Sequence, residues 1–193
     1  MKKNHLTNST HLNIGKEDNN IAFLFSCPGQ MEEDLSKPVA CQTGINLNIL
    51  LKLLHGMNKS IFKYINRYDY RITNTWDKVE YQAKTGRTEA TLKNIKESQN
   101  LERLERELKD KKILILFGEN AKKIKILLNF NGIIIESRHL SFQSLNKIDK
   151  DIDGIILKAK QKGNTEKRLV VIANSILKQY NIANKYPSGY LSA

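Results

Sequence analysis

Polar side chains that could act in catalysis or binding follow three short apolar segments of this chain. The stretch 26–44 follows the first and contains the acidic group 32–34, Asn74 closes the second, and His139 follows the last. An amide both donates and accepts hydrogen bonds, an imidazole exchanges a proton near neutral pH, and a carboxylate stabilises positive charge or activates water. Each group also has a structural alternative: a turn or helix-capping Asn, a structural His and a solvated acidic turn.

The elements that would position these residues can be recognised from their apolar patterns. Four short apolar runs are typical of strands buried on both faces, at 21–25, 70–74, 113–118 and 132–136. Helical periodicity marks the segments 47–54 (with Gly56 as its expected end), 90–109, 119–129 and 166–180. This alternation predicts an α/β fold, a three-layer α/β/α sandwich around a central four-stranded, mostly parallel sheet.

In open parallel sheets, ligands bind beyond the carboxyl ends of the strands. That edge would collect 26–44, the Asn74-Thr75-Trp76 turn and the Arg138-His139-Leu140-Ser141 turn. The polar residues of interest are therefore expected to meet at one edge of the sheet.

Length and composition limit the remaining possibilities. The 193 residues suit one domain over 21–193, and the polar, unpatterned residues 1–20 are expected to be a mobile or loosely docked lead-in. Two cysteines are too few for a disulfide scaffold or for a four-thiolate site. No apolar run reaches the roughly 20 residues of a membrane-spanning helix, so we expect a cytoplasmic protein that does not bind membranes.

The net charge points to a polyanionic partner. Lys and Arg outnumber Asp and Glu by 32 to 20, which gives +12, and nucleic acid is the commonest partner of such a chain. Solvated lysines in a Lys- and Asn-rich composition are the alternative. On charge alone, RNA remains as open as DNA.

The order of short motifs resembles the uracil-DNA glycosylase superfamily, most closely its bacterial and archaeal branch. Pro28-Gly29, Glu32-Glu33, Lys37-Pro38 and Gly44 keep the spacing of that branch's first motif, P-G-x-x-E-D, R-P, G. Four further matches follow in order: Ile72-Thr73-Asn74, Thr85-Gly86-Arg87-Thr88, Phe117-Gly118-Glu119-Asn120-Ala121 and His139-Leu140-Ser141. The resemblance covers about residues 21–146 and implies an enzyme that flips a base out of DNA and cleaves its N-glycosidic bond.

The resemblance also implies roles for single residues. Asn74 would read the edge of a pyrimidine, and His139 would donate a hydrogen bond to the oxygen of the departing base. Ser26, Glu32 and Glu33 stand where a carboxylate would stabilise the sugar cation or activate water. The expected substrate-binding residues are Pro28, Gly29, Gln30, Val39, Cys41, Asn74 and Trp76. No metal or other cofactor is expected, and we expect a monomer.

DNA contacts are expected beside the motifs. Lys37, Arg87 and Arg138 would bind phosphates, and Leu140, Ser141, Phe142 and Gln143 would enter the minor groove, although a core position for Phe142 stays open. Clustering alone adds further candidates, which a solvated helix face explains equally well: Lys122, Lys123, Lys125, Lys158, Lys160, Lys162, Lys167 and Arg168.

The departures from the resembling branch bear on the substrate. Ser26 replaces its acidic residue, Val39 replaces the Phe that stacks on uracil, Leu140 replaces Pro, and the iron–sulfur cysteines are absent. A smaller pocket wall favours an altered base, such as a bulky modified cytosine of phage DNA excised in anti-phage defence. The alternatives are a uracil-DNA glycosylase of base-excision repair, and a catalytically inactive DNA-binding module, which Ser26 favours.

Overall fold

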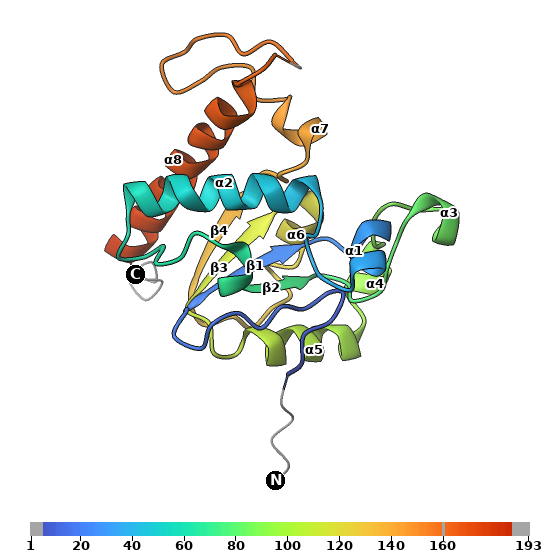
Figure 1. Cartoon of the computed structure of the whole chain (residues 1–193). Helices are drawn as coiled ribbons and strands as arrows, with labels where there is room; N and C mark the ends of the chain where they lie inside the picture. The colour runs from blue at the N-terminus through green and yellow to red at the C-terminus, as the bar shows by residue number, and fades with distance from the viewer. Residues whose placement is uncertain (1–5, 160, 187–193) are drawn as a thin grey trace.

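A single parallel sheet organises the chain. The computed structural model describes residues 6–159 and 161–186. Its four strands are β1 (Ile21–Phe25), β2 (Arg71–Asn74), β3 (Ile113–Phe117) and β4 (Ile133–Ser137). They lie in the order β2-β1-β3-β4 with every neighbouring pair parallel (Figure 1). The predicted α/β fold is confirmed, and the sheet is entirely parallel.

Helices cover both faces of the sheet, so the molecule has three layers (Figure 1). One face packs against α2 (Gln42–Met57) and α8 (Asn164–Lys185), and the other against α5 (Ser98–Leu108) with its neighbours α4 (Leu92–Ile95) and α6 (Glu119–Lys123). The shorter elements are α1 (Gln30–Leu35), η1 (Arg67–Asp69), α3 (Gln82–Thr85) and α7 (Phe142–Leu145). In the part of the chain that the structure describes, no helix combines the length and apolar character needed to cross a membrane.

The side chains of β1 alternate between the two faces of the sheet, and both faces are covered. Phe23 and Phe25 belong to the core beneath α2 and α8, whereas Ala22 and Leu24 belong to the core beneath α5. All five residues of the strand are buried. Because successive side chains of a strand point to opposite faces, a strand covered on both faces must be apolar throughout.

Two helices are shorter than the sequence predicts. The expected helix over 90–109 is split into α4 and α5, and Asn100 of α5 donates its buried amide to the carbonyls of Ile95 and Thr75 at 3.0 and 2.8 Å across the break. The expected helix over 119–129 ends at Lys123, after which i→i+3 turns continue.

The ends of the other two helices also differ from expectation. Gly56 does not end its helix: α2 runs through it and ends at Met57, and the N–H of the C-cap residue Asn58 donates to the carbonyl of Leu54. The predicted helix over 166–180 is longer at both ends, as α8 covers Asn164–Lys185.

The N-terminal lead-in also differs from the expectation, because its described part is docked against the fold. Asn13 forms an antiparallel bridge with Ile72 on the outer edge of β2, and Leu12 is buried. His11 Nε2 lies 3.1 Å from the buried Glu107 carboxylate, and Arg71 donates to the carbonyl of Ile14 at 2.8 Å. The segment thereby covers an edge strand that would otherwise expose unpaired backbone groups.

Candidate functional site

A cavity of about 400 Å³ opens at the carboxyl ends of β1, β3 and β4. Its wall includes Ser26, Gly118, Asn120, Arg138 and His139. It therefore lies at the edge where ligands of parallel sheets bind. A larger hollow of about 510 Å³ lies between α5 and residues 128–131, and its wall contains none of the residues expected to act on a substrate.

The His139 ring is held in one orientation and one tautomer. The N–H of Ser141 donates to Nδ1 of His139 at 3.1 Å, so the neutral ring carries its proton on Nε2. The ring meets Phe25 edge-on with centroids 6.0 Å apart. Burial lowers the pKa of His139 below its usual 6.5, and the nearby Glu32 carboxylate offsets this only in part. His139 is therefore a neutral hydrogen-bond donor at pH 7.

Gly118 makes room for this ring. It has φ +94°, and a Cβ at this position would lie 3.2 Å from Cβ and 3.4 Å from Cδ2 of His139. Any larger residue at this position would thus meet both backbone strain and the imidazole.

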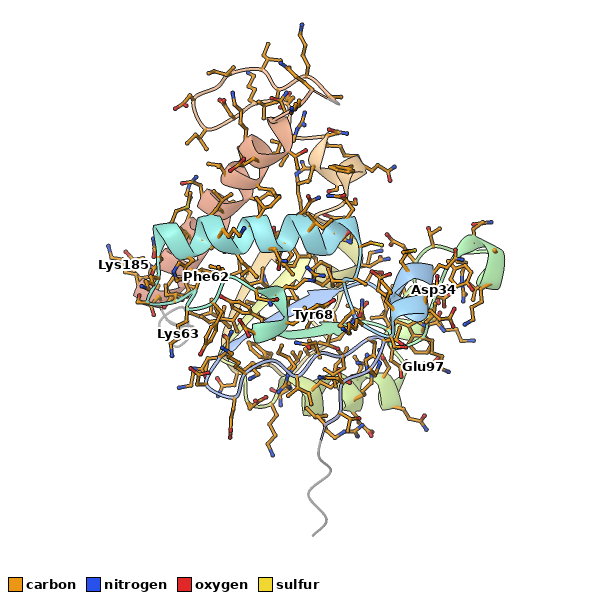
Figure 2. All side chains as sticks on the ribbon, in the orientation of Figure 1. Asp34, Phe62, Lys63, Tyr68, Glu97 and Lys185 are labelled. Atoms are coloured by element: carbon orange, nitrogen blue, oxygen red, sulfur yellow. The ribbon has the colours of Figure 1, made fainter. Side chains whose placement is uncertain are left out.

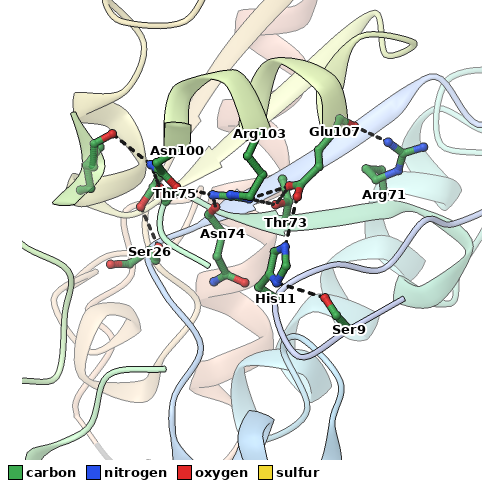
Figure 3. Close-up of polar contacts among 11 residues, drawn as sticks. Ser9, His11, Ser26, Arg71, Thr73, Asn74, Thr75, Asn100, Arg103 and Glu107 are labelled. Atoms are coloured by element: carbon green, nitrogen blue, oxygen red, sulfur yellow. Dashed lines mark hydrogen bonds and ion pairs between the residues drawn. The ribbon is translucent and has the colours of Figure 1, made fainter. Parts of the chain in front are cut away.

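Asn74 presents a buried acceptor with nothing to satisfy it. It closes β2 beside Phe25, and its Oδ1 has no hydrogen-bond partner among the described residues although the side chain is 3% exposed. Its main-chain carbonyl accepts from Arg103 at 2.9 Å, and the side chain points away from Arg103 (Figure 3). Among the described residues, the Asn74 side chain therefore makes no capping or turn hydrogen bond through its oxygen. An unpaired buried acceptor costs about 1–3 kcal/mol, so such groups call for a partner that satisfies them.

A buried ionic network fixes the backbone at Asn74 from the opposite face of the sheet. Arg103 donates to Glu107 at 2.7 Å and to Asn100 at 2.8 Å, and Glu107 also accepts from Thr73 at 2.5 Å (Figure 3). The pKa of Glu107 stays below its usual value, since its bonds to His11, Arg103 and Thr73 outweigh the desolvation that would raise it. The end of β2 is thus anchored by charged groups that do not line the cavity.

Glu32 and Glu33 have structural partners instead of catalytic positions. The two carboxylate oxygens of Glu32 accept the N–H groups of Gly29 and Ala40 at 3.1 and 3.2 Å, which ties the turn after β1 to the segment before α2. Glu33 pairs with Lys84, and this bond lowers the pKa of its carboxyl. Asp34 lies exposed on α1 (Figure 2). Neither glutamate lines the cavity, so the two residues do not occupy the predicted catalytic place.

The residues of the first motif form the frame of the turn. Pro28 is buried and its carbonyl accepts the N–H of Glu80 at 2.9 Å, whereas Gln30 is exposed at the start of α1. Val39 adopts φ +52°, an uncommon conformation for a β-branched residue, and its carbonyl would lie 2.0 Å from a Cβ at Gly44. Cys41 occupies the N-cap position of α2 without a side-chain capping bond. None of these predicted substrate-binding residues lines the cavity: Pro28, Gly29, Gln30, Val39 and Cys41.

Two predicted contact residues are buried in the core, and those predictions are wrong. Trp76 is 5% exposed among the side chains beneath α5, and Leu140 is fully buried with its carbonyl accepting from Asn46 at 2.7 Å. Their neighbours fit the prediction better. Phe142 is 49% exposed, which excludes the core alternative, and Ser141 and Gln143 line the cavity.

The predicted basic contacts divide into paired and unpaired groups. Arg138 lines the cavity, Lys37 is exposed, and Arg87 is bound to the buried Glu80 at 2.8 Å. Lys122, Lys123 and Lys125 bond to Glu119, Asn120 and Glu136.

Arg168 is 1% exposed and donates to main-chain carbonyls, so it cannot contact DNA. Lys158, Lys162 and Lys167 are exposed, and Lys160 lies outside the described residues.

The cavity wall also contains residues for which the sequence predicted no role, among them Asn120 and Glu89. Asn120 donates to Ser26 Oγ at 3.5 Å and to the carboxylate of Glu89. Asn120 belongs to the motif 117–121, whereas Glu89 directly follows the motif 85–88 and carries no periodicity or spacing signal of its own. Beside them, burial raises the pKa of Cys27 to about 11, so that thiol stays neutral.

The chain was compared with protein families and with curated proteins: no family model matches it, and no curated protein matches it at a significant level. Within residues 6–159 and 161–186, no three His, Cys, Asp or Glu side chains come together as a metal site. Any functional conclusion therefore depends on the site itself.

Proposed function

We propose that this protein is a monofunctional DNA glycosylase, which extrudes a base from DNA and hydrolyses its N-glycosidic bond to leave an abasic site. The observation that carries the proposal is the placement of a neutral His139, with its proton on Nε2, in the wall of a cavity at the carboxyl edge of the sheet. The order of motifs that resembles the uracil-DNA glycosylase superfamily supports the same reaction class.

The chemistry of bond cleavage fits these groups. Breaking the bond leaves negative charge on the base and oxocarbenium character on the sugar, so a donor placed at the base oxygen lowers the barrier. His139 supplies such a donor without needing to be charged. Asn74 closes β2 at the same edge of the sheet but outside the cavity wall, and its buried oxygen has no partner among the described residues. A pyrimidine edge presents a donor that would satisfy it.

The proposed substrate is a bulky modified cytosine of the kind found in phage DNA, which would make the protein an anti-phage enzyme. The cavity beside His139 is polar, with Ser26, Asn120 and Gln143 in its wall, which supports a base that carries extra polar groups. Val39, which stands where the resembling branch carries Phe, is buried in the core outside that wall and adds no support of its own. Uracil in a repair pathway is the competing substrate, and it rests on the motif frame alone. A non-catalytic DNA-binding module is the competing function, and the absence of a carboxylate at Ser26 favours it.

An abasic-site assay tests the proposal. Duplex oligonucleotides carrying one uracil, one 5-hydroxymethylcytosine or one glucosylated 5-hydroxymethylcytosine are incubated with the protein, and abasic sites are cleaved with alkali and resolved on denaturing gels. We expect the wild type to nick at least one of these strands and His139→Gln to lose about 100-fold or more of the rate. DNA binding without nicking of any strand would establish the binding module instead.

A further inference from the structure

Glu89 is a carboxylate in the wall of the same cavity as Ser26 and His139. It lies on the segment 86–90, between α3 and α4. This segment is fixed against the end of β1, because Cys27 Sγ contacts the Thr88 carbonyl at 3.9 Å and Ala90 is buried in the core beneath α5. Glu89 therefore reaches the cavity from an anchored segment, although its own side chain is exposed.

Asn120 links Glu89 to the strand end. Lys123 Nζ donates to Asn120 Oδ1 at 2.8 Å, which turns the amide NH₂ toward the cavity. That NH₂ donates both to Ser26 Oγ, at 3.5 Å, and to the carboxylate of Glu89. The Glu89 carboxylate is thus held next to the position where the resembling branch carries its acidic residue.

The other carboxylates near this edge have partners that occupy them. Glu32 accepts two backbone N–H groups and Glu33 pairs with Lys84. Glu119, the second carboxylate in the cavity wall, pairs with Lys122 at 2.7 Å and is 82% exposed. Glu89 is bound by the uncharged amide of Asn120, which leaves its charge available to a reacting group.

We propose that Glu89 is a catalytic residue that supplies the carboxylate missing at Ser26, an inference that rests on the proposed glycosylase function. The Glu89 carboxylate accepts a hydrogen bond from the attacking water and takes its proton as the water oxygen bonds to C1′ of the sugar. The electron pair of the N-glycosidic bond leaves with the base, whose oxygen is stabilised by His139 Nε2–H. Glu89 then returns the proton to solvent, and the base takes up a proton from solvent.

Matched substitutions of two exposed carboxylates, one inside and one outside the cavity wall, test this role. Glu89→Gln keeps the shape and a hydrogen-bonding group but removes the charge, and Glu17→Gln makes the same change on the N-terminal segment, away from the cavity. With whichever duplex of the abasic-site panel the wild type nicks fastest, we expect a single-turnover rate loss of about 100-fold for Glu89→Gln. Glu17→Gln should stay within about threefold of wild type, with DNA affinity and melting temperature kept in both variants.

A second substitution distinguishes the loss of the catalytic carboxylate from a displacement of Asn120. Ser26→Asp in the Glu89→Gln background puts a carboxylate back beside Asn120, and we expect it to restore at least about tenfold of the rate. A Glu89→Gln protein that nicks at the wild-type rate, or a double variant with no recovery, would overturn the role of Glu89 while leaving the glycosylase proposal intact. A wild type that nicks none of the panel overturns both.

Discussion

The backbone N–H of Ser141 donates a hydrogen bond to Nδ1 of His139 at 3.1 Å. A backbone N–H cannot accept, so this bond excludes a proton on Nδ1 and assigns the ring proton to Nε2. Ser141 is also the N-cap of α7, where its Oγ accepts from the N–H of Ser144 at 3.4 Å. One residue therefore fixes both the imidazole tautomer and the start of a helix.

The two roles of Ser141 can be separated by substitution. Its φ of −69° suits proline, so Ser141→Pro removes the N–H and the cap, whereas Ser141→Ala removes the cap alone. Both should lose about 1 kcal/mol of unfolding free energy in urea titrations. Only Ser141→Pro should lose about tenfold or more of the single-turnover rate. Without the Ser141 N–H, the His139 ring can carry its proton on Nδ1 instead of Nε2. Equal rates for the two variants would show that the hydrogen bond to His139 does not matter.

Burial of His139 makes stability depend on pH. Its pKa is lowered on folding because burial disfavours the charged ring, and Glu32 opposes this only in part. The unfolded chain then binds more protons than the folded one between the usual pKa of 6.5 and the lowered value. Stability from this group is complete above pH 6.5 and is lost as pH falls toward the lowered pKa. Urea unfolding of the wild type and His139→Gln at several pH values should show a difference that changes within this window and is flat above it.

Gly118 is expected to be irreplaceable for activity. Alanine there would suffer the strain of φ +94° and press its Cβ onto His139. Gly86 provides the control, since it has φ +69° and open space where a Cβ would lie. Gly118→Ala should cost about 1–3 kcal/mol and Gly86→Ala about 1–2 kcal/mol in urea titrations. The nicking rate should fall only for Gly118→Ala, and an active Gly118→Ala protein would contradict the tight packing of His139.

The strands could be predicted closely because their pattern is local, and the site could be predicted only in part. Five consecutive buried residues in β1 leave no ambiguity, and the strand-end rule then places Asn74 and His139 at one edge. Leu140 and Phe142 look alike in sequence, yet one is fully buried and the other half exposed. Glu89 reaches the cavity only through contacts of its segment with Cys27 and the core, and such contacts leave no periodic signal.

The ion pair between Arg103 and Glu107 should contribute mainly to stability. Arg103→Met removes the partner of the buried Glu107 and the donor to the Asn74 carbonyl, whereas Arg106→Met changes an exposed residue of the same helix. Removing one member of a buried pair costs about 3–5 kcal/mol. The melting temperature should therefore fall by about 10 °C for Arg103→Met and by less than about 2 °C for Arg106→Met. Similar melting temperatures would show that His11 and Thr73 satisfy Glu107 without Arg103.

Phe142 should act on duplex DNA rather than on the chemical step. It is 49% exposed at the start of α7, beside the cavity-lining Gln143, so it can fill the space that an extruded base leaves in the stack. Stacking of this kind is worth about 1–3 kcal/mol. Phe142→Ala should therefore lower nicking of duplex DNA by about 5- to 150-fold and leave nicking of the single strand nearly unchanged. Ile126→Ala, at a residue 89% exposed and outside the cavity wall, should change neither rate. An equal loss on both forms of DNA would place Phe142 in the binding of the base itself, because a single strand has no paired stack to fill.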